Sequence, residues 1–104
     1  MAWVYLVIAG LMEIVWAFGL KYSNGWSRLW PSLITAGGMI VSFYFLSLAL
    51  RTLPIGTAYA IWTGIGAVGT VIVGMMFLGE PRDLLRISFV LAIVVGIVGL
   101  KATA

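Results

Sequence analysis

Apolar residues dominate four stretches of the chain, approximately residues 2–20, 32–50, 55–78 and 87–100, and charges, prolines or glycines separate one stretch from the next. A helix of about 20 apolar residues is long enough to cross a bilayer. In lipid only helices and closed barrels satisfy their own backbone hydrogen bonds, and four strands cannot close a barrel. The pattern therefore predicts an all-α integral membrane protein in which residues 1–104 form a single four-helix transmembrane domain.

The three breaks between these stretches predict loops at the membrane surface. Residues 21–31 contain a turn-forming Asn-Gly pair, two cations and two tryptophans, which suit the interface. The break at residues 51–56 is so short that we expect the second and third helices to be antiparallel neighbours. Residues 79–86 carry Glu80 and Asp83, which we expect to be solvated loop charges, with Asp83 in the first turn of the fourth helix.

Composition narrows the class of protein. Of 104 residues, 63% are hydrophobic and only 9% are charged, which predicts a multi-pass protein of the cell's inner (plasma) membrane in contact with the lipid bilayer. The first stretch is too long for the apolar region of a signal peptide and no small-residue cleavage site follows it, which predicts a retained helix. Without cysteine or histidine, thiol chemistry and the common metal sites are excluded, so we expect neither an enzyme nor a cofactor or metal. The net charge of +3 comes from cations in or beside the loops, which indicates headgroup anchors and no nucleic-acid partner.

One carboxylate, Glu13, stands inside the first apolar stretch. At about 1.5 Å per residue it lies roughly 15 Å from Trp3, near the midplane of an apolar slab about 30 Å thick. A structural acid would need a basic partner, but no Lys or Arg lies within any of the four stretches. Acids at this depth usually face a protein interior or a water pathway, so Glu13 is predicted to be functional.

Helical spacing shows which groups can reach Glu13. Small residues such as Gly10 and one indole, Trp16, share its face of the first helix, which predicts close approach of another helix. On the second helix Ser42 lies near mid-depth in a stripe that also contains Thr35 and Gly38. Ser42 could therefore reach Glu13. The alternative is that its hydroxyl bonds back to the carbonyl four residues earlier on the same helix.

The third stretch places Tyr59, Trp62 and Thr63 on one face. Tyr59 could equally be an interfacial belt residue, but Trp62 is too deep for a belt, and a deep indole needs an acceptor for its N–H. Gly64 and Gly66 are expected to allow close packing and to act as a hinge. In the fourth stretch a small-residue seam at Ala92, Gly96 and Gly99 predicts an oligomer contact.

Four helices with one carboxylate cannot easily enclose a solute pathway, and the chain shows no internal duplication. A second chain inserted upside down would supply the missing half and bring two Glu13 groups to one cavity. The loop charges permit this antiparallel, dual-topology homodimer, since four cations on one side against two on the other give a weak orientation signal. Protons and a cation competing for the same carboxylates would be sufficient for antiport.

The motifs carry a family resemblance. Residues 13–25, 29–32 and above all the run Gly56-Thr-Ala-Tyr-Ala-Ile-Trp-Thr-Gly-Ile-Gly66 resemble the small multidrug resistance (SMR) family, specifically its guanidinium-exporter (Gdx) branch. The resemblance implies a dual-topology homodimer that exports guanidinium in exchange for protons. It also implies that Glu13 binds substrate and protons, and that Tyr59 lines the pathway. By the same resemblance, the side chains that donate hydrogen bonds to Glu13 are Trp16, Ser42 and Trp62.

Two other functions remain open at this point. A multidrug exporter of hydrophobic quaternary ammonium ions is the nearest alternative, although that branch of the family typically has Gly where Trp16 stands. A structural or regulatory membrane subunit is the alternative from another class. Guanidinium itself suits the expected site, because it is planar, always charged and presents a fork of N–H donors that carboxylates hold well.

Overall fold

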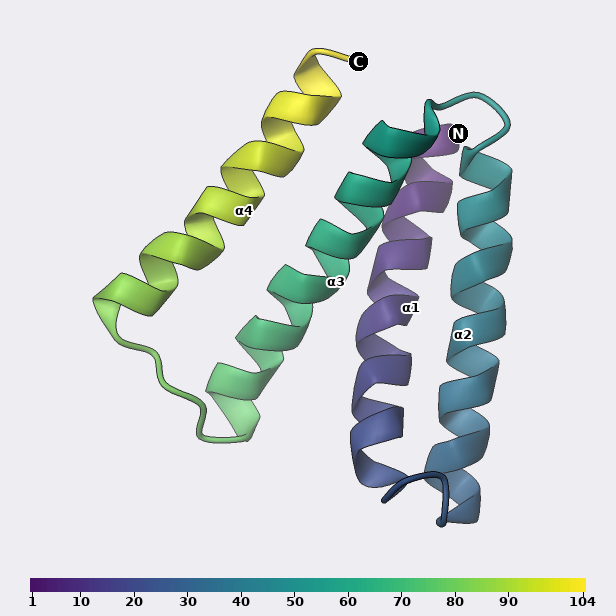
Figure 1. Ribbon diagram of the computed structural model, residues 1–104, viewed down its shortest axis with the longest axis vertical. Helices are drawn as coiled ribbons and strands as arrows, with labels where there is room; N and C mark the ends of the chain where they lie inside the picture. The colour runs from purple at the N-terminus through teal and green to yellow at the C-terminus, as the bar shows by residue number, and fades with distance from the viewer.

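The computed structural model describes residues 1–104 as four helices without any strand (Figure 1). They are α1 (Ala2–Tyr22), α2 (Leu29–Ala49), α3 (Ile55–Phe77) and α4 (Leu84–Ala102). Each helix is long and apolar enough to cross a membrane. The molecule is a flat slab of 41 × 35 × 17 Å, and the prediction of an all-α membrane fold is confirmed.

The helices run alternately up and down, with both chain ends and the α2–α3 loop at one end and the other two loops at the opposite end (Figure 1). α1 lies in the middle and packs on both α2 and α3, whereas α4 packs on α3 alone. α2 and α3 are antiparallel but barely touch. The expectation that they are packed neighbours was therefore wrong, because α1 fills the space between them.

Four helix ends lie beyond the predicted bounds, and one of them is the end of α1 at Tyr22. α2 begins at Leu29 because Arg28 is extended and Pro31 falls within the first turn, where a missing N–H costs nothing. α4 begins at Leu84, directly after Asp83, and extends to Ala102. Helices can include charged residues in their terminal turns, where long side chains reach toward water.

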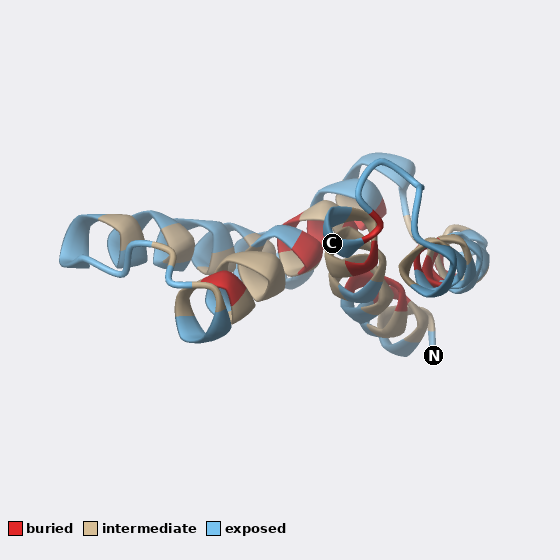
Figure 2. Cartoon of the chain, turned by 90° about the horizontal axis from the view of Figure 1, so that it is seen from below, coloured by how far each residue is buried: buried red, intermediate tan, exposed pale blue.

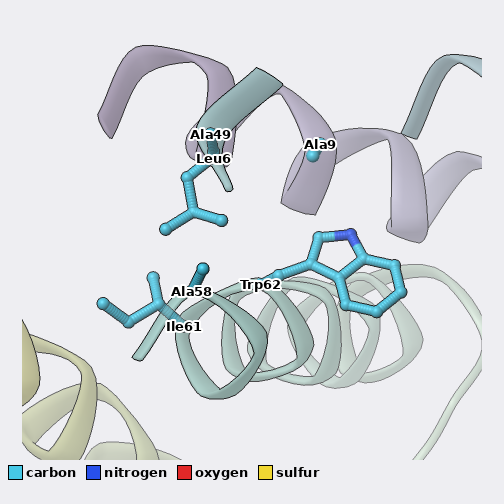
Figure 3. Close-up of a cluster of buried hydrophobic side chains, with 6 residues drawn as sticks. All are labelled: Leu6, Ala9, Ala49, Ala58, Ile61 and Trp62. Atoms are coloured by element: carbon cyan, nitrogen blue, oxygen red, sulfur yellow. The ribbon is translucent and has the colours of Figure 1, made fainter. Parts of the chain in front are cut away.

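The buried core joins α1, the end of α2 and the first half of α3 (Figure 3). Most of its side chains are small or medium-sized, so the three helices approach closely. α4 contributes no buried residue, and the view along the helices shows its surface almost entirely exposed or half-buried (Figure 2). The six core residues are Leu6, Ala9, Ala49, Ala58, Ile61 and Trp62.

Two glycines that were expected to pack closely do so. A Cβ atom at Gly10 would lie 2.6 Å from Cγ2 of Ile65, so α1 meets α3 there with no room for a side chain. A Cβ atom at Gly64 would lie 2.9 Å from Cδ1 of Ile97 on α4. Gly64 is thus where α4 rests on α3.

The loop between α3 and α4 corrects one prediction. Glu80 is not a free, solvated charge, because its Oε1 accepts a hydrogen bond of 2.8 Å from Nη2 of Arg86 in an ion pair that is about two-thirds shielded from solvent. The Glu80 carboxylate lies against Gly74, which has no side chain to obstruct it. Asp83 is exposed, as expected, and stands at the N-cap of α4 without a side-chain capping bond.

Candidate functional site

Glu13 lies in the middle of α1 and faces α3 across a hollow of about 320 Å³. The hollow follows directly from helical spacing, because residues three and four apart share one face of a helix. α1 contributes Glu13, Trp16 and Ala17, and α3 contributes Thr63, Gly66, Ala67, Thr70 and Val71. A single acid therefore lies in a partly polar hollow between two membrane-spanning helices.

Gly66 makes the room in which the Glu13 carboxyl group sits. A Cβ atom at residue 66 would lie 2.6 Å from Cδ and 2.9 Å from Cβ of Glu13, and it would collide with Oε2. Carbon atoms pack best at about 3.5–4.0 Å, so no larger residue fits without displacing the acid. Gly66 was predicted to be a close-packing residue, and its packing partner is the site carboxylate itself.

Two polar atoms at this hollow have no partner. Oε2 of Glu13 and Nε1 of Trp16 are both buried, and neither makes a hydrogen bond. The one ion pair of the chain joins Glu80 and Arg86, so Glu13 has no ionic partner either. Buried polar atoms are nearly always paired in proteins, and exceptions of this kind often mark functional positions.

Ser42 and Trp62 form a separate polar chain that joins three helices. Nε1 of Trp62 donates to Oγ of Ser42 over 2.9 Å, and the Ser42 hydroxyl donates to the Ala9 carbonyl over 2.7 Å. The prediction that Trp62 needs a deep acceptor is confirmed. The alternative of a back-bonded Ser42 is wrong, because the hydroxyl reaches α1 instead of its own helix.

The implied hydrogen bonds to Glu13 are not present within this chain. Ser42 and Trp62 use their donors on each other and on Ala9, and Trp16 lines the hollow without donating. Ser42 and Trp62 are fully and almost fully buried, at 0% and 6% exposure, so they support the helices next to the site.

Tyr59 stands apart from the Glu13 hollow. It is 56% exposed, and its ring meets the edge of Trp62 with centroids 5.5 Å apart. The predicted residues therefore fall into two groups. Glu13, Trp16 and Gly66 line the hollow, while Tyr59 adjoins the Ser42–Trp62 pair.

Comparison with known proteins assigns the family. The profile of the Small Multidrug Resistance protein family matches residues 1–94. The chain belongs to the small multidrug resistance family. This confirms the resemblance seen in the motifs, and it makes the chain a multi-pass membrane transporter and not an enzyme.

Relatives of similar length are named guanidinium exporters. The guanidinium exporter of Escherichia coli (strain K12) is 57% identical over 101 residues, covering 97% of this chain and 96% of that protein. The guanidinium exporter of Yersinia pseudotuberculosis is 58% identical over 97% of each chain. That of Citrobacter freundii is 58% identical over 97% of this chain and 96% of its own length.

The SMR chain also has hollow-lining residues that were not predicted as site residues. Ala67 and Val71 lie one turn after Thr63 and Ala67 respectively, on the face that Gly66 opens. The signal that could have found them is the spacing of four residues, repeated twice from Thr63. No three His, Cys, Asp or Glu side chains gather anywhere in the chain, so Glu13 alone offers anionic oxygens at the hollow.

Proposed function

We propose that this chain exports guanidinium in exchange for protons, as an antiparallel homodimer in which the two Glu13 groups share one central site. The observation that carries the proposal is the Glu13–Trp16 hollow, with its unpaired buried acceptor and donor. Relatives that are 57–58% identical over nearly their whole length bear the name guanidinium exporter, which supports the choice of substrate.

The chemistry of the hollow suits guanidinium. The cation presents N–H donors in a planar fork, and a carboxylate accepts such a fork through both oxygens. Glu13 is the only acid that lines the hollow and it has no ion-pair partner, so a bound guanidinium would supply its counter-ion. The Trp16 indole lies beside Glu13 in the same wall, where an aromatic face favours a flat cation.

Two features support a second chain. The hollow is open along one side, so one chain alone does not enclose a solute. α4 contributes nothing to the core, and Cβ atoms at Gly96 and Gly99 would meet nothing, which leaves the small-residue seam free for another helix. An inverted partner restores the in-plane pseudo-twofold relation that transporters of this kind use around a midplane site.

Exchange then follows from competition at one anion. A proton on the Glu13 carboxyl group removes the charge that holds guanidinium, and guanidinium excludes the proton in turn. If the central site opens to one side of the membrane at a time, each passage of the cation outward requires protons to return inward. No residue outside the site needs to titrate for this coupling.

The test is uptake of labelled guanidinium into proteoliposomes under an imposed pH gradient. Glu13→Gln keeps the size of the side chain but not its charge, and we expect it to abolish exchange. Asp83→Asn is the matched control, because it removes an exposed acid that has no ion-pair partner, and we expect it to keep full activity. Exchange that survives Glu13→Gln, or that is equally lost with Asp83→Asn, would refute the assigned site.

A tetraalkylammonium ion serves as the competing substrate in the same vesicles. We expect it to be carried poorly, because the Trp16 indole occupies part of the space beside the carboxylate. Preferential transport of the tetraalkylammonium ion would instead favour the multidrug alternative.

A further inference from the structure

Three hollows meet at Trp3, in the first turn of α1. One is a groove of about 300 Å³ between α1, α3 and α4. A second, of about 480 Å³, lies against the α2–α3 loop with Arg51 in its wall. A third, of about 310 Å³, runs along α1 and shares Lys101 with the groove. This end of the molecule is therefore hollowed around one indole and flanked by two cations.

The groove between α1, α3 and α4 is apolar except at its mouth. Seven of its eight lining residues are hydrophobic, among them Leu6, Ile61 and Val98, and the eighth is Lys101. The Lys101 ammonium group lies 5.5 Å from the centroid of the Trp3 ring. It has no anionic partner, since the only ion pair lies in the α3–α4 loop at the other end of the helices.

The depth of the mouth matches the membrane interface. Trp3 is in the first turn of α1 and Lys101 in the last turn of α4, and tryptophan and lysine at such positions usually mark the headgroup level. From there the groove runs inward along apolar side chains. Basic pockets between membrane helices are a known way to hold anionic lipid headgroups.

We propose that this groove binds one acyl chain of an anionic phospholipid, whose phosphate is held by Lys101. The chain fills the apolar recess between α1, α3 and α4, and the phosphate supplies the charge partner that Lys101 lacks. The Trp3 indole, which faces the ammonium group, forms the rim between chain and headgroup. The inference concerns a lipid site and is independent of the identity of the exported cation.

A second copy of the chain is the competing occupant, and the geometry of α4 argues against it. Successive residues of a helix are about 100° apart, so Gly99 lies roughly 200° around α4 from Lys101. The open small-residue seam at Gly96 and Gly99 therefore faces away from the groove. A partner seated on that seam leaves the groove open to lipid.

Native mass spectrometry of the purified full chain in detergent tests the proposal. Dioleoyl phosphatidylglycerol and dioleoyl phosphatidylcholine are added separately, so that only the headgroup differs. We expect one lipid retained per chain and about fivefold stronger retention of phosphatidylglycerol, the usual effect of one basic side chain on an anionic lipid. Free inorganic phosphate should not displace it, because the acyl chain supplies much of the binding.

Three variants make the result specific. Lys101→Gln should remove the preference for phosphatidylglycerol, whereas Arg82→Gln, an exposed cation in the opposite loop, should keep it. Val98→Trp places a large ring in the groove and should reduce retention of both lipids. Equal retention of both lipids by the unmodified chain, or a preference that survives Lys101→Gln, would overturn the proposal. So would Val98→Trp that splits the dimer without changing lipid retention, because a second copy would then occupy the groove.

Discussion

Gly66→Ala perturbs the site by a single methyl group aimed at the Glu13 carboxyl group. The substitution removes no charge and no hydrogen-bonding group. It places a Cβ atom 2.6 Å from Cδ of Glu13, where packed carbon atoms need about 3.5 Å. The carboxyl group must therefore move by about 1 Å, or α1 must separate from α3 by a similar amount.

The expected loss of guanidinium affinity follows from that displacement. Moving a binding group by about 1 Å costs on the order of a hundredfold in a site that depends on orientation, which corresponds to about 2.7 kcal/mol. Helix stability should change in the opposite direction, since Ala is favoured over Gly by up to about 1 kcal/mol within a helix. Gly66→Ala should thus give a folded protein that binds guanidinium about a hundredfold more weakly.

Gly56→Ala is the matched control on the same helix. A Cβ atom at Gly56 would meet nothing within 4 Å, so that substitution changes helix propensity alone. Binding of labelled guanidinium to both purified variants, together with their thermal unfolding midpoints, separates the site effect from the helix effect. If Gly66→Ala binds guanidinium as well as Gly56→Ala does, the Glu13 carboxyl group does not need its place against residue 66, and the reasoning fails.

Three further perturbations address the neighbouring groups. Ser42→Ala leaves the buried Trp62 N–H without an acceptor and should lower stability by about 1 to 3 kcal/mol, and a Ser42→Ala/Trp62→Phe double variant should recover part of that loss in thermal unfolding. Should the double variant unfold no later than Ser42→Ala alone, the indole was not the group left unpaired. Trp16→Gly opens the hollow, so guanidinium export should fall while tetraalkylammonium transport rises. An unchanged ratio of the two transport rates would count against Trp16 as a specificity residue. Guanidinium affinity should fall as pH is lowered, by up to about tenfold per pH unit for one competing proton and about a hundredfold for two. Affinity that stays constant over a range in which the protein remains folded would remove the shared-site mechanism.

The sequence predicted the spans well and their ends less well. Apolar runs locate each helix because lipid exposure requires them, but Pro31 and Arg86 were assigned to loops although both lie in the first turn of a helix. The first residue of a helix depends on where the preceding backbone is extended, as it is at Arg28. The run of apolar residues does not show where that happens. The pairing of Glu80 with Arg86 was missed for a similar reason, since it requires the loop to fold back on α3.

Within the site, spacing along one helix was more informative than spacing between helices. Trp16 was placed correctly beside Glu13 because both lie on α1, three residues apart. Ser42 was picked out as a polar position of α2 and it is buried, but its partner depends on how α2 is rotated about its axis, and the sequence of α2 leaves that rotation open. The structure turns the hydroxyl to Ala9, so Ser42 and Trp62 make elsewhere the hydrogen bonds that the family resemblance implied for Glu13, and Trp16 makes none within the chain.

The polar link between Trp62 and Ser42 has a mechanical consequence. α1 and α2 are packed along their length and joined by the Ser42 hydroxyl, whereas α4 is attached to α3 alone. α3 packs more extensively on α1 than on α4, and the Trp62 hydrogen bond is the one polar link between α3 and the α1–α2 pair. Gly66 is one helical turn from that link, and the far end of α4 is much more distant. Because α4 contacts α3 alone, we expect a shift of α3 where Glu13 meets Gly66 to move α4 with it.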